Sequence, residues 1–302
     1  MATGPRAIED LREAGTVDLV VGPRLRNLEG LTVNRVWPIP ARRLIGPFVF
    51  LDHMQPAELT AGRGLDVPPH PHIGLATVTY LFEGELLHAD SLGLRQLIRP
   101  GALNWMTAGR GITHSERTPA AERARASRLH GMQAWVALPR AAEADAPRFE
   151  HVPAAELPAI ERDGCTLKLI AGAAFGARAP VATASPLFYL EARLPASRGL
   201  VLPHSLGQRG IYIVSGRIAI DGREFAAGRL LVLTDGRDCR LDAGCETRLM
   251  LLGGAPLDGE RLIWWNFVAS NAAAIEAARA DWAAGRFPPV PGDPAGMPMP
   301  AA

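Results

Sequence analysis

Short apolar or alternating runs, separated by turns, recur along most of the chain. Dipeptides such as Glu83-Gly84 and Leu92-Gly93 are typical of hairpin turns between strands. In the first half the runs cover residues 31–36, 48–51, 76–83, 85–89, 95–98, 103–106 and 131–138. In the second half they cover residues 165–171, 187–192, 210–214, 217–220, 230–233 and 247–252. Short strands with frequent turns predict an all-β protein built from barrels or sandwiches.

This series of strands is interrupted once, which predicts two domains. Residues 141–160 are rich in Ala, Pro and acidic residues and show no strand period, so we interpret them as a linker. An N-terminal barrel is therefore expected over residues 1–140 and a C-terminal barrel over 161–270. The length of 302 residues and the hydrophobic content of 48% are sufficient for two buried cores.

The last segment, residues 271–302, has a helical pattern followed by a Pro-rich tail. Asn271 is a suitable N-cap and Gly285 a suitable end, so we expect a helix over 271–284. Its apolar face consists of Ala274, Ile275, Ala278 and Trp282. This face is expected to pack on the outside of a barrel, and the tail from Pro288 is expected to be extended and poorly ordered at its end.

The composition excludes several classes of partner. The net charge of +1 gives no electrostatic basis for direct binding of nucleic acid or an anionic membrane. No apolar run approaches the length needed to span a bilayer, and the acidic first ten residues do not resemble a signal peptide. The 3 cysteines lack a Cys-x-x-Cys pair and are expected to be reduced, so we predict a cytoplasmic protein.

Two pairs of polar residues interrupt this β pattern. His70 and His72 form the first pair, and His114 and Glu116 form the second. Residues i and i+2 of a strand point to the same face, so each pair offers two ligands to one side. Two such strands facing each other in a barrel would place three imidazoles and a carboxylate around one divalent metal, with room for water or substrate. Pro71 cannot donate a ladder hydrogen bond, which favours an edge strand or the barrel mouth.

A degenerate internal repeat links the two halves. Pro71-His72 precedes Gly84 with the same spacing as Pro203-His204 precedes Gly216. The second-half equivalents of His70, His114 and Glu116 are then Leu202, Leu241 and Ala243. The second barrel retains only one histidine, so the metal is expected in the first barrel, and His204 is expected to be a hydrogen-bonded loop residue.

These motifs resemble those of a known family. Gly-x5-His-x-His followed by Pro-Gly and a third histidine is similar to the cupin barrel, and HPHIGLATVTYLFEGELLHADSLG and NWMTAGRGITHSER resemble pirin, a two-cupin family. Similar stretches extend from Val36 to residues 261–268, so the resemblance covers most of the chain. It implies a bicupin fold, with two jelly-roll-like β-barrels. The glutamate two residues after the third histidine, Glu116, is the pirin arrangement.

The resemblance implies oxygen-dependent cleavage of flavonols, the quercetin 2,3-dioxygenase activity of some pirins. Glu116 would ligate the metal and also accept the proton of the substrate hydroxyl as the catalytic base. Fe(II) fits the ligands best, because positions remain for a phenolic or enol substrate and dioxygen together; Mn, Ni, Co and Cu accept the same ligands, and Zn binds them without redox chemistry. The candidate pocket residues are His53, Asn104, Met106, Arg110 and Gln133.

Two other readings remain open at this point. Pirins also include transcription cofactors, so the chain could be a non-catalytic iron or redox sensor that acts through a protein partner. It could also be a structural protein stabilised by its metal. Ile73, Leu75 and Ala76 replace the arginine, aromatic and acidic residues of many pirins, which predicts a more apolar barrel mouth and a hydrophobic, planar ligand. His88 and His130 alternate with apolar neighbours and are expected to be structural.

Overall fold

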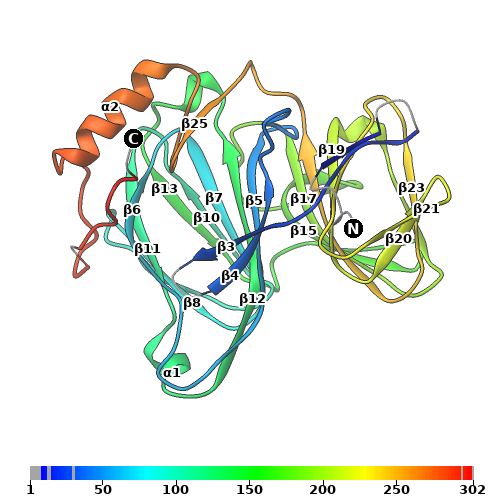
Figure 1. Ribbon diagram of the computed structural model, residues 1–302, viewed down its shortest axis with the longest axis horizontal. Coiled ribbons are helices and arrows are strands. Elements are labelled where there is room, and N and C mark those ends of the chain that lie inside the picture. Colours follow the sequence, from blue (N-terminus) through cyan, green and yellow to red (C-terminus); the bar gives the residue numbers. More distant parts are fainter. Residues whose placement is uncertain (1–7, 12–14, 29–30, 294, 301–302) are drawn as a thin grey trace, which may run out of the picture. The chain divides into compact units, whose positions relative to one another are not determined.

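The computed structural model describes residues 8–11, 15–28, 31–293 and 295–300 of the protein. Residues 1–7, on which the expected lack of a signal peptide partly rests, lie outside the described residues. The named strands pair in antiparallel fashion, and they form two compact units (Figure 1). The predicted all-β class, with two β-barrels and a C-terminal helix, is confirmed.

The N-terminal barrel consists of two antiparallel sheets. The larger sheet has, in spatial order, β13 (Arg148–Val152), β10 (Leu103–Thr107), β7 (Leu75–Glu83), β12 (Ser127–Ala137), β5 (Phe48–Leu59), β4 (Leu31–Trp37) and β3 (Arg24–Leu28). The smaller sheet has β6 (Asp66–His72), β11 (Ile112–Arg117), β8 (Leu86–Asp90) and β9 (Arg95–Ile98). A short helix, α1 (Ala120–Arg123), connects β11 to β12.

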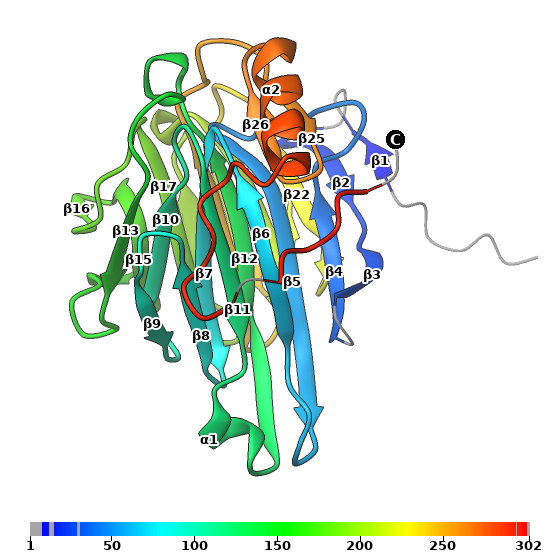
Figure 2. The same cartoon turned by 90° about the vertical axis from the view of Figure 1, so that its left-hand side faces the viewer.

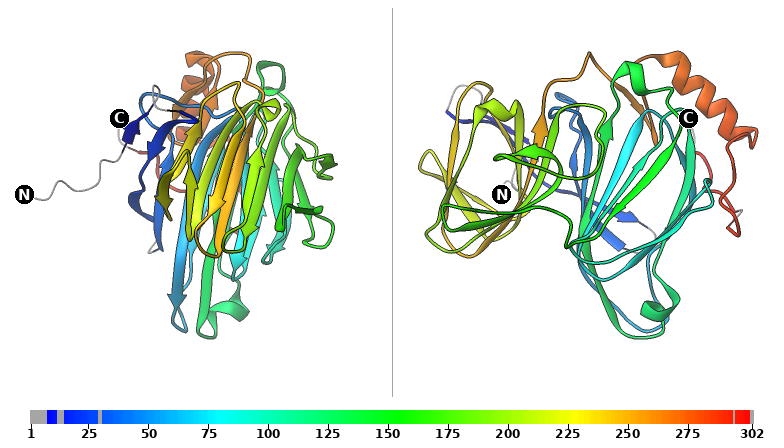
Figure 3. Two further views of the ribbon diagram at one scale, coloured as in Figure 1. Left: turned by 90° about the vertical axis from the view of Figure 1, so that its right-hand side faces the viewer. Right: turned by 180° about the vertical axis from the view of Figure 1, so that it is seen from behind.

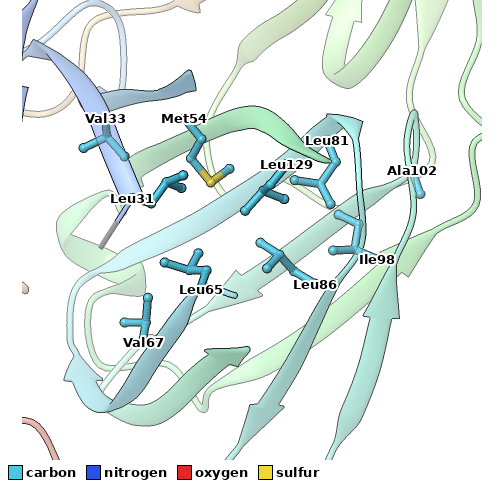
Figure 4. Packing of buried hydrophobic residues seen from close by; sticks show 10 residues of the cluster. All are labelled: Leu31, Val33, Met54, Leu65, Val67, Leu81, Leu86, Ile98, Ala102 and Leu129. Carbon is cyan, nitrogen blue, oxygen red and sulfur yellow. The ribbon is translucent and has the colours of Figure 1, made fainter. Parts of the chain in front are cut away.

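A buried apolar cluster holds the two sheets of this barrel together (Figure 4). Met54, Leu81 and Leu129 come from the larger sheet, and Val67 and Leu86 come from the smaller one. Each fully buried side chain of this size contributes roughly 1.5–3 kcal/mol. The cluster therefore fixes β6 and β8 against the larger sheet, and it also shows which side chains of β5, β7 and β12 face the barrel interior.

The C-terminal barrel is built in the same way (Figure 3). Its larger sheet contains β1 (Ile8–Asp10), β2 (Val17–Val21), β22 (Leu230–Leu233), β19 (Gln208–Ser215), β24 (Thr247–Gly254), β17 (Leu187–Leu194), β15 (Cys165–Ala174) and β14 (Ala159–Arg162), and β16 (Ala177–Arg178) pairs with β15. Its smaller sheet contains β18 (Gly199–Leu202), β23 (Cys239–Ala243), β20 (Arg217–Ile220) and β21 (Arg223–Ala226). The 3₁₀-helix η2 (His204–Leu206) follows β18.

The limits of the compact units differ from the predicted domain limits. The strands β1 and β2 come first in the sequence but pair with each other and with β22 of the C-terminal barrel. The expected linker, residues 141–160, contains β13, whose residues pair with β10. The sequence pattern did not indicate this short strand, because Ala and Pro residues lie on both sides of β13. The 3₁₀-helix η1 (Arg140–Ala142) precedes it.

The chain after the second barrel returns to the N-terminal unit. A hairpin of β25 (Leu262–Trp264) and β26 (Phe267–Ala269) leads into α2 (Ala272–Ala283), and the Asn271 side chain accepts a hydrogen bond from the N–H of Ala274, which confirms the predicted N-cap. Ile275 and Ala278 of α2 pack on Phe267. The tail then follows the outside of β6 and β11 (Figure 2).

This tail is held by specific contacts. The Asp293 carboxylate accepts two hydrogen bonds of 2.8 Å from Arg117 of β11. The N–H of Met297 donates to the carbonyl of Pro69 at 2.6 Å, which gives the edge strand β6 a backbone partner on its open side. The described part of the tail is therefore docked, and the last two residues, at the end where poor order is expected, lie outside the described residues.

Candidate metal centre

The three predicted histidine ligands lie on adjacent strands of the smaller sheet. His70 and His72 belong to β6 and His114 to β11, and His70 pairs directly with His114 in the register. β6 is the edge strand of this sheet, as Pro71 predicted, because a proline that cannot donate is tolerated there. Antiparallel pairing at this register brings all three side chains to the same face of the sheet.

The imidazoles form a compact cluster. One ring nitrogen from each of the three residues lies within 4.8 Å of the others. The Nε2 atoms of His72 and His114 are 3.1 Å apart. His72 and His114 are each 1% exposed, whereas His70 is 7% exposed, so His70 is on the side of the cluster nearest to solvent.

Backbone carbonyls orient two of the rings. The Nδ1–H of His70 donates to the carbonyl of Pro68 at 2.9 Å, and the Nδ1–H of His72 donates to the carbonyl of Asn266 at 3.0 Å. Because the proton of each ring is on Nδ1, each Nε2 carries a lone pair. At most one Nε2–H, from His114, is available for these two lone pairs. The Nε2 lone pairs therefore lack enough protons to satisfy them. A bound cation would supply the missing positive charge, so these three imidazoles fit a metal ion.

Burial keeps these histidines in the neutral form that binds metals. Desolvation lowers the pKa of His70 from 6.5 to about 4, and it also lowers the pKa values of His72 and His114 well below 6.5. The hydrogen bond to Pro68 opposes the shift at His70, and the neighbouring histidines add to the shift at His114. All three rings are therefore neutral at pH 7, and no proton has to be displaced from an imidazolium before a cation binds.

Glu116 lies near this cluster but is not a member of it. A bulge separates His114 from Glu116 on β11, and among the described residues the group with donor atoms within 4.8 Å consists of the three histidines. The Glu116 carboxylate accepts a hydrogen bond of 3.1 Å from the Thr79 hydroxyl of β7. Burial raises its pKa, which makes this carboxylate a stronger base than an exposed glutamate.

Three of the predicted pocket residues lie in the N-terminal barrel interior. The Gln133 amide oxygen is 2.9 Å from the Thr79 hydroxyl, so Gln133 lies beside the position of Glu116. The Asn104 side chain is 2.7 Å from the His151 Nδ1. Met106 is instead part of an apolar cluster with Ala108 and Ile112.

The other two predicted pocket residues point elsewhere. His53 is next to Met54, which faces the interior, so His53 is on the opposite face of the larger sheet. There its Nε2 is 2.8 Å from the Nε2 of His130, and its Nδ1 is 2.7 Å from the Gln55 amide. The Arg110 side chain is exposed, and its backbone N–H donates to the carbonyl of Asp145 at 2.9 Å.

The apolar residues after His72 have a packing role. Ile73 belongs to the cluster around Phe267 and α2, and Leu75 and Ala76 are fully buried. The carbonyl of Ile73 accepts a hydrogen bond of 3.2 Å from the N–H of Val268. The inference of an apolar mouth from these residues therefore needs correction, because they contact the β25–β26 hairpin and neighbouring strands.

The same hairpin supplies residues that the sequence did not indicate. Trp265 adopts a φ of +52°, a conformation that is rare for a bulky residue, at the turn that carries the Asn266 carbonyl. Gly74 allows the close approach, because a Cβ there would lie 2.0 Å from the Val268 carbonyl oxygen. On β8, the His88 Nδ1 is 3.3 Å from the His114 Nδ1, and the His88 Nε2 is 3.0 Å from the Asp90 carboxylate. The sequence pattern predicts a structural role for His88 and does not single out Asp90.

His204 in the C-terminal barrel has the role predicted for it. It begins the 3₁₀-helix η2, and its Nδ1 is 2.6 Å from the Asp238 carboxylate at the surface. Leu202, Leu241 and Ala243 are buried. The interior of this smaller sheet is therefore apolar at the positions that the repeat matches to His70, His114 and Glu116.

The sequence matches the pirin family over residues 30–136 and the pirin C-terminal cupin domain over residues 189–288. The chain belongs to the pirin family. A pirin-like protein of Caulobacter vibrioides is 48% identical over 274 residues, covering 90% of this chain and 94% of that protein. The family resemblance inferred from the histidine motifs is thus confirmed, and the two barrels are the two cupin domains of a pirin.

Solved structures agree with this assignment. A crystal structure of quercetin 2,3-dioxygenase from Acinetobacter baumannii matches with a TM-score of 0.86 and 34% identity, covering 94% of this pirin-family chain and 95% of that chain. The bacterial pirin YhhW from Escherichia coli, solved in complex with nickel(II), has the same fold, with a TM-score of 0.61 and 20% identity over 83% of this chain and 99% of that one. No helix among the described residues is long and apolar enough to cross a membrane.

Proposed function

We propose that this pirin-family chain holds one divalent metal ion through His70, His72, His114 and Glu116. We further propose that it catalyses oxygen-dependent ring cleavage of a flavonol or a related phenol or enol. The observation that carries the metal proposal is the 3.1 Å approach of the buried Nε2 atoms of His72 and His114, with the Nδ1–H of His72 already donated to Asn266. The reaction class is supported by the similarity to quercetin 2,3-dioxygenase from Acinetobacter baumannii.

A bound redox-active ion, with Fe(II) as first candidate and Mn, Ni, Co or Cu as alternatives, would supply Lewis acidity towards an enolate oxygen and electron transfer to dioxygen; Zn would supply only the first. The role of the protein is to hold three neutral imidazoles in place and to provide a base. Glu116 is suited to accept the hydroxyl proton, because its raised pKa increases its basicity. The stacked rings of Phe50 and Trp135, 4.1 Å apart, form an aromatic wall beside His72.

The direct test combines metal analysis with oxygen uptake. Protein purified without chelator is loaded with each candidate metal, and oxygen consumption is followed with quercetin, other flavonols and simple enols. We expect about one metal per chain and flavonol-dependent uptake with Fe(II), which chelation abolishes. Protein that binds no stoichiometric metal would contradict the site, whereas metal-loaded protein that is inert with every substrate would contradict the reaction.

Replacing Glu116 with glutamine separates ligation from proton transfer. The amide retains an oxygen donor but cannot accept the proton, so Glu116→Gln should bind metal more weakly than the wild type and more tightly than His114→Ala. Its oxygenase turnover should fall by about 10²-fold or more, the usual contribution of a general base. Glu58→Gln, an exposed glutamate of the same barrel, is the matched control. Undiminished turnover in Glu116→Gln would remove its catalytic role.

The burial of the cluster favours one alternative function. His72 and His114 are each 1% exposed, which restricts access for a ligand as large as a flavonol. A non-catalytic iron or redox sensor needs no such access, because it reports the state of its metal to a protein partner. This alternative predicts inert protein in the oxygen assay and a partner that binds the Fe(II) and Fe(III) forms with different affinity.

A further inference from the structure

His114 differs from the other two histidines in what holds its Nδ1. The Nδ1 atoms of His70 and His72 face backbone carbonyls, whereas the Nδ1 of His114 is 3.3 Å from the Nδ1 of His88. A carbonyl can only accept a hydrogen bond, so it fixes the proton of its partner on Nδ1. An imidazole nitrogen can either donate or accept. The tautomer of His114 therefore depends on the tautomer of His88.

Asp90 determines which nitrogen of His88 carries the proton. The Oδ2 of Asp90 is 3.0 Å from the Nε2 of His88. A carboxylate only accepts, so the Nε2–H of His88 donates to it and the Nδ1 of His88 keeps its lone pair. The Asp90 side chain is fully buried, and its Oδ1 accepts hydrogen bonds from the N–H groups of Leu92 at 2.9 Å and Leu94 at 3.3 Å. The turn after β8 thus locks this carboxylate in place.

The strand register places this pair directly beside the ligands. On β8 and β11, Asp90 pairs with His114 and His88 pairs with Glu116. The His88 ring also stacks on Phe149 of β13 with centroids 4.4 Å apart, which restricts its rotation. His88 is therefore a buried, oriented acceptor for the Nδ1–H of His114.

We propose that Asp90 and His88 are positioning residues that hold His114 in its Nδ1–H form, so that its Nε2 lone pair points at the metal. The proposal rests on the metal site proposed above. With all three protons on Nδ1, the three Nε2 lone pairs converge, and a buried carboxylate is linked to the site through two imidazoles. Such outer partners usually contribute 10–100-fold to metal affinity, and the order carboxylate–histidine–histidine extends the common carboxylate–histidine arrangement by one ring.

The first test is Asp90→Asn. The asparagine can still accept from the turn, but its NH₂ can donate to His88 Nε2, which places the His88 proton on Nδ1 and leaves His114 protonated on Nε2. In an aspartate–histidine pair, replacing the aspartate with asparagine is known to produce the wrong histidine tautomer with little change in geometry. We expect the dissociation constant for Co(II), measured by chelator competition, to rise about 10–100-fold. Melting of the metal-free variant checks that it is folded.

Two variants of His88 give an independent test that leaves the turn intact. His88→Asn can place its amide oxygen near the original Nδ1 and still accept from His114, so its affinity for Co(II) should stay within a few-fold of the wild type. His88→Leu removes the acceptor and should weaken binding about 10–100-fold. His53→Asn, a buried histidine on the other face of the larger sheet, is the control and should bind Co(II) as the wild type does.

A spectroscopic measurement reports the tautomer itself. In metal-free protein labelled with ¹⁵N-histidine, we expect His114 to be protonated at Nδ1 in the wild type and in His88→Asn, and at Nε2 in Asp90→Asn. Wild-type protein that binds no metal would contradict the proposed site. Wild-type protein that binds metal, with Asp90→Asn and His88→Leu showing unchanged affinity and tautomer, would refute the role of Asp90 and His88 alone.

Discussion

The smaller sheets of the two barrels have the same strand order, but their inward-facing residues differ in polarity. In the first barrel the spatial order is β6-β11-β8-β9, and in the second it is β18-β23-β20-β21. In both sheets, the strand that comes first along the chain lies at one edge and pairs with the strand that comes last, which in turn pairs with the second. His70 pairs with His114 in one sheet, and Leu200 pairs with Leu241 in the other. The same strand order therefore forms without histidine at these positions, so the fold alone does not require the polar cluster.

The register also corrects the repeat derived from spacing. Pairing with β23 assigns Leu200 to the position of His70 and Leu202 to that of His72, two residues earlier than the motif alignment gave. The reason is local. Only Ile73 and Gly74 separate β6 from β7, whereas the 3₁₀-helix η2 and its flanking residues separate β18 from β19. His204 consequently lies outside the barrel interior.

The largest expected effect comes from removing two ligands of the first barrel. His70→Ala combined with His114→Ala leaves one imidazole of the cluster, that of His72, and the variant should lose its stoichiometric metal completely. His204→Ala in the second barrel should retain about one metal per chain, measured by elemental analysis after dialysis. Full metal content in the double variant would show that the two barrels do not differ as proposed.

The reverse change should destabilise the second barrel. Leu241 is fully buried and pairs with the fully buried Leu200, so Leu241→His would combine a packing defect with a buried imidazole opposite a leucine. We expect a loss of about 2–5 kcal/mol in the free energy of unfolding, measured in urea, with no gain of metal. His114→Leu in the metal-free first barrel should lower the free energy of unfolding by less, because it also removes the close approach between the Nε2 atoms of His72 and His114. Equal losses would contradict this view of the two interiors.

The pH dependence should distinguish the barrels more finely. The pKa of His70 is about 4 in the folded protein against 6.5 in the unfolded chain, so the unfolded state takes up a proton first as the pH falls. Stability of the metal-free protein should therefore decrease between about pH 6.5 and 4, by about 3 kcal/mol from His70 alone. Urea unfolding of the His70→Ala, His114→Ala variant should be flatter over this range. An unchanged slope would mean that these histidines are not desolvated.

The sequence predicted much of the fold because its strongest patterns are local. Alternation, hairpin glycines and the Asn271 cap each depend on a few neighbouring residues, and so do His-x-His and His-x-Glu on their strands. The strand β13 was missed because its short run lies among Ala and Pro residues. The predicted role of Ile73 failed because its neighbour Phe267 is remote in the sequence.

The rest of the candidate site depends on contacts that a linear pattern does not contain. His53 has an unremarkable strand context, and only the interior position of Met54 shows that it faces away from the cluster. The Asn266 carbonyl is a backbone group, so the identity of the residue gives no sign of its contact with His72. His88 and Asp90 become informative only when the register places them opposite Glu116 and His114.

The hydrogen bond from His72 to Asn266 has a consequence for synthesis of the protein. The two residues are 194 positions apart in the sequence. At about 5–20 residues per second, a ribosome needs roughly 10–40 s to add that length of chain. All four proposed ligands therefore leave the ribosome well before the carbonyl that orients one of them. A nascent chain could meet metal ions during this interval, but the ring of His72 acquires its final orientation only after the second barrel has been made.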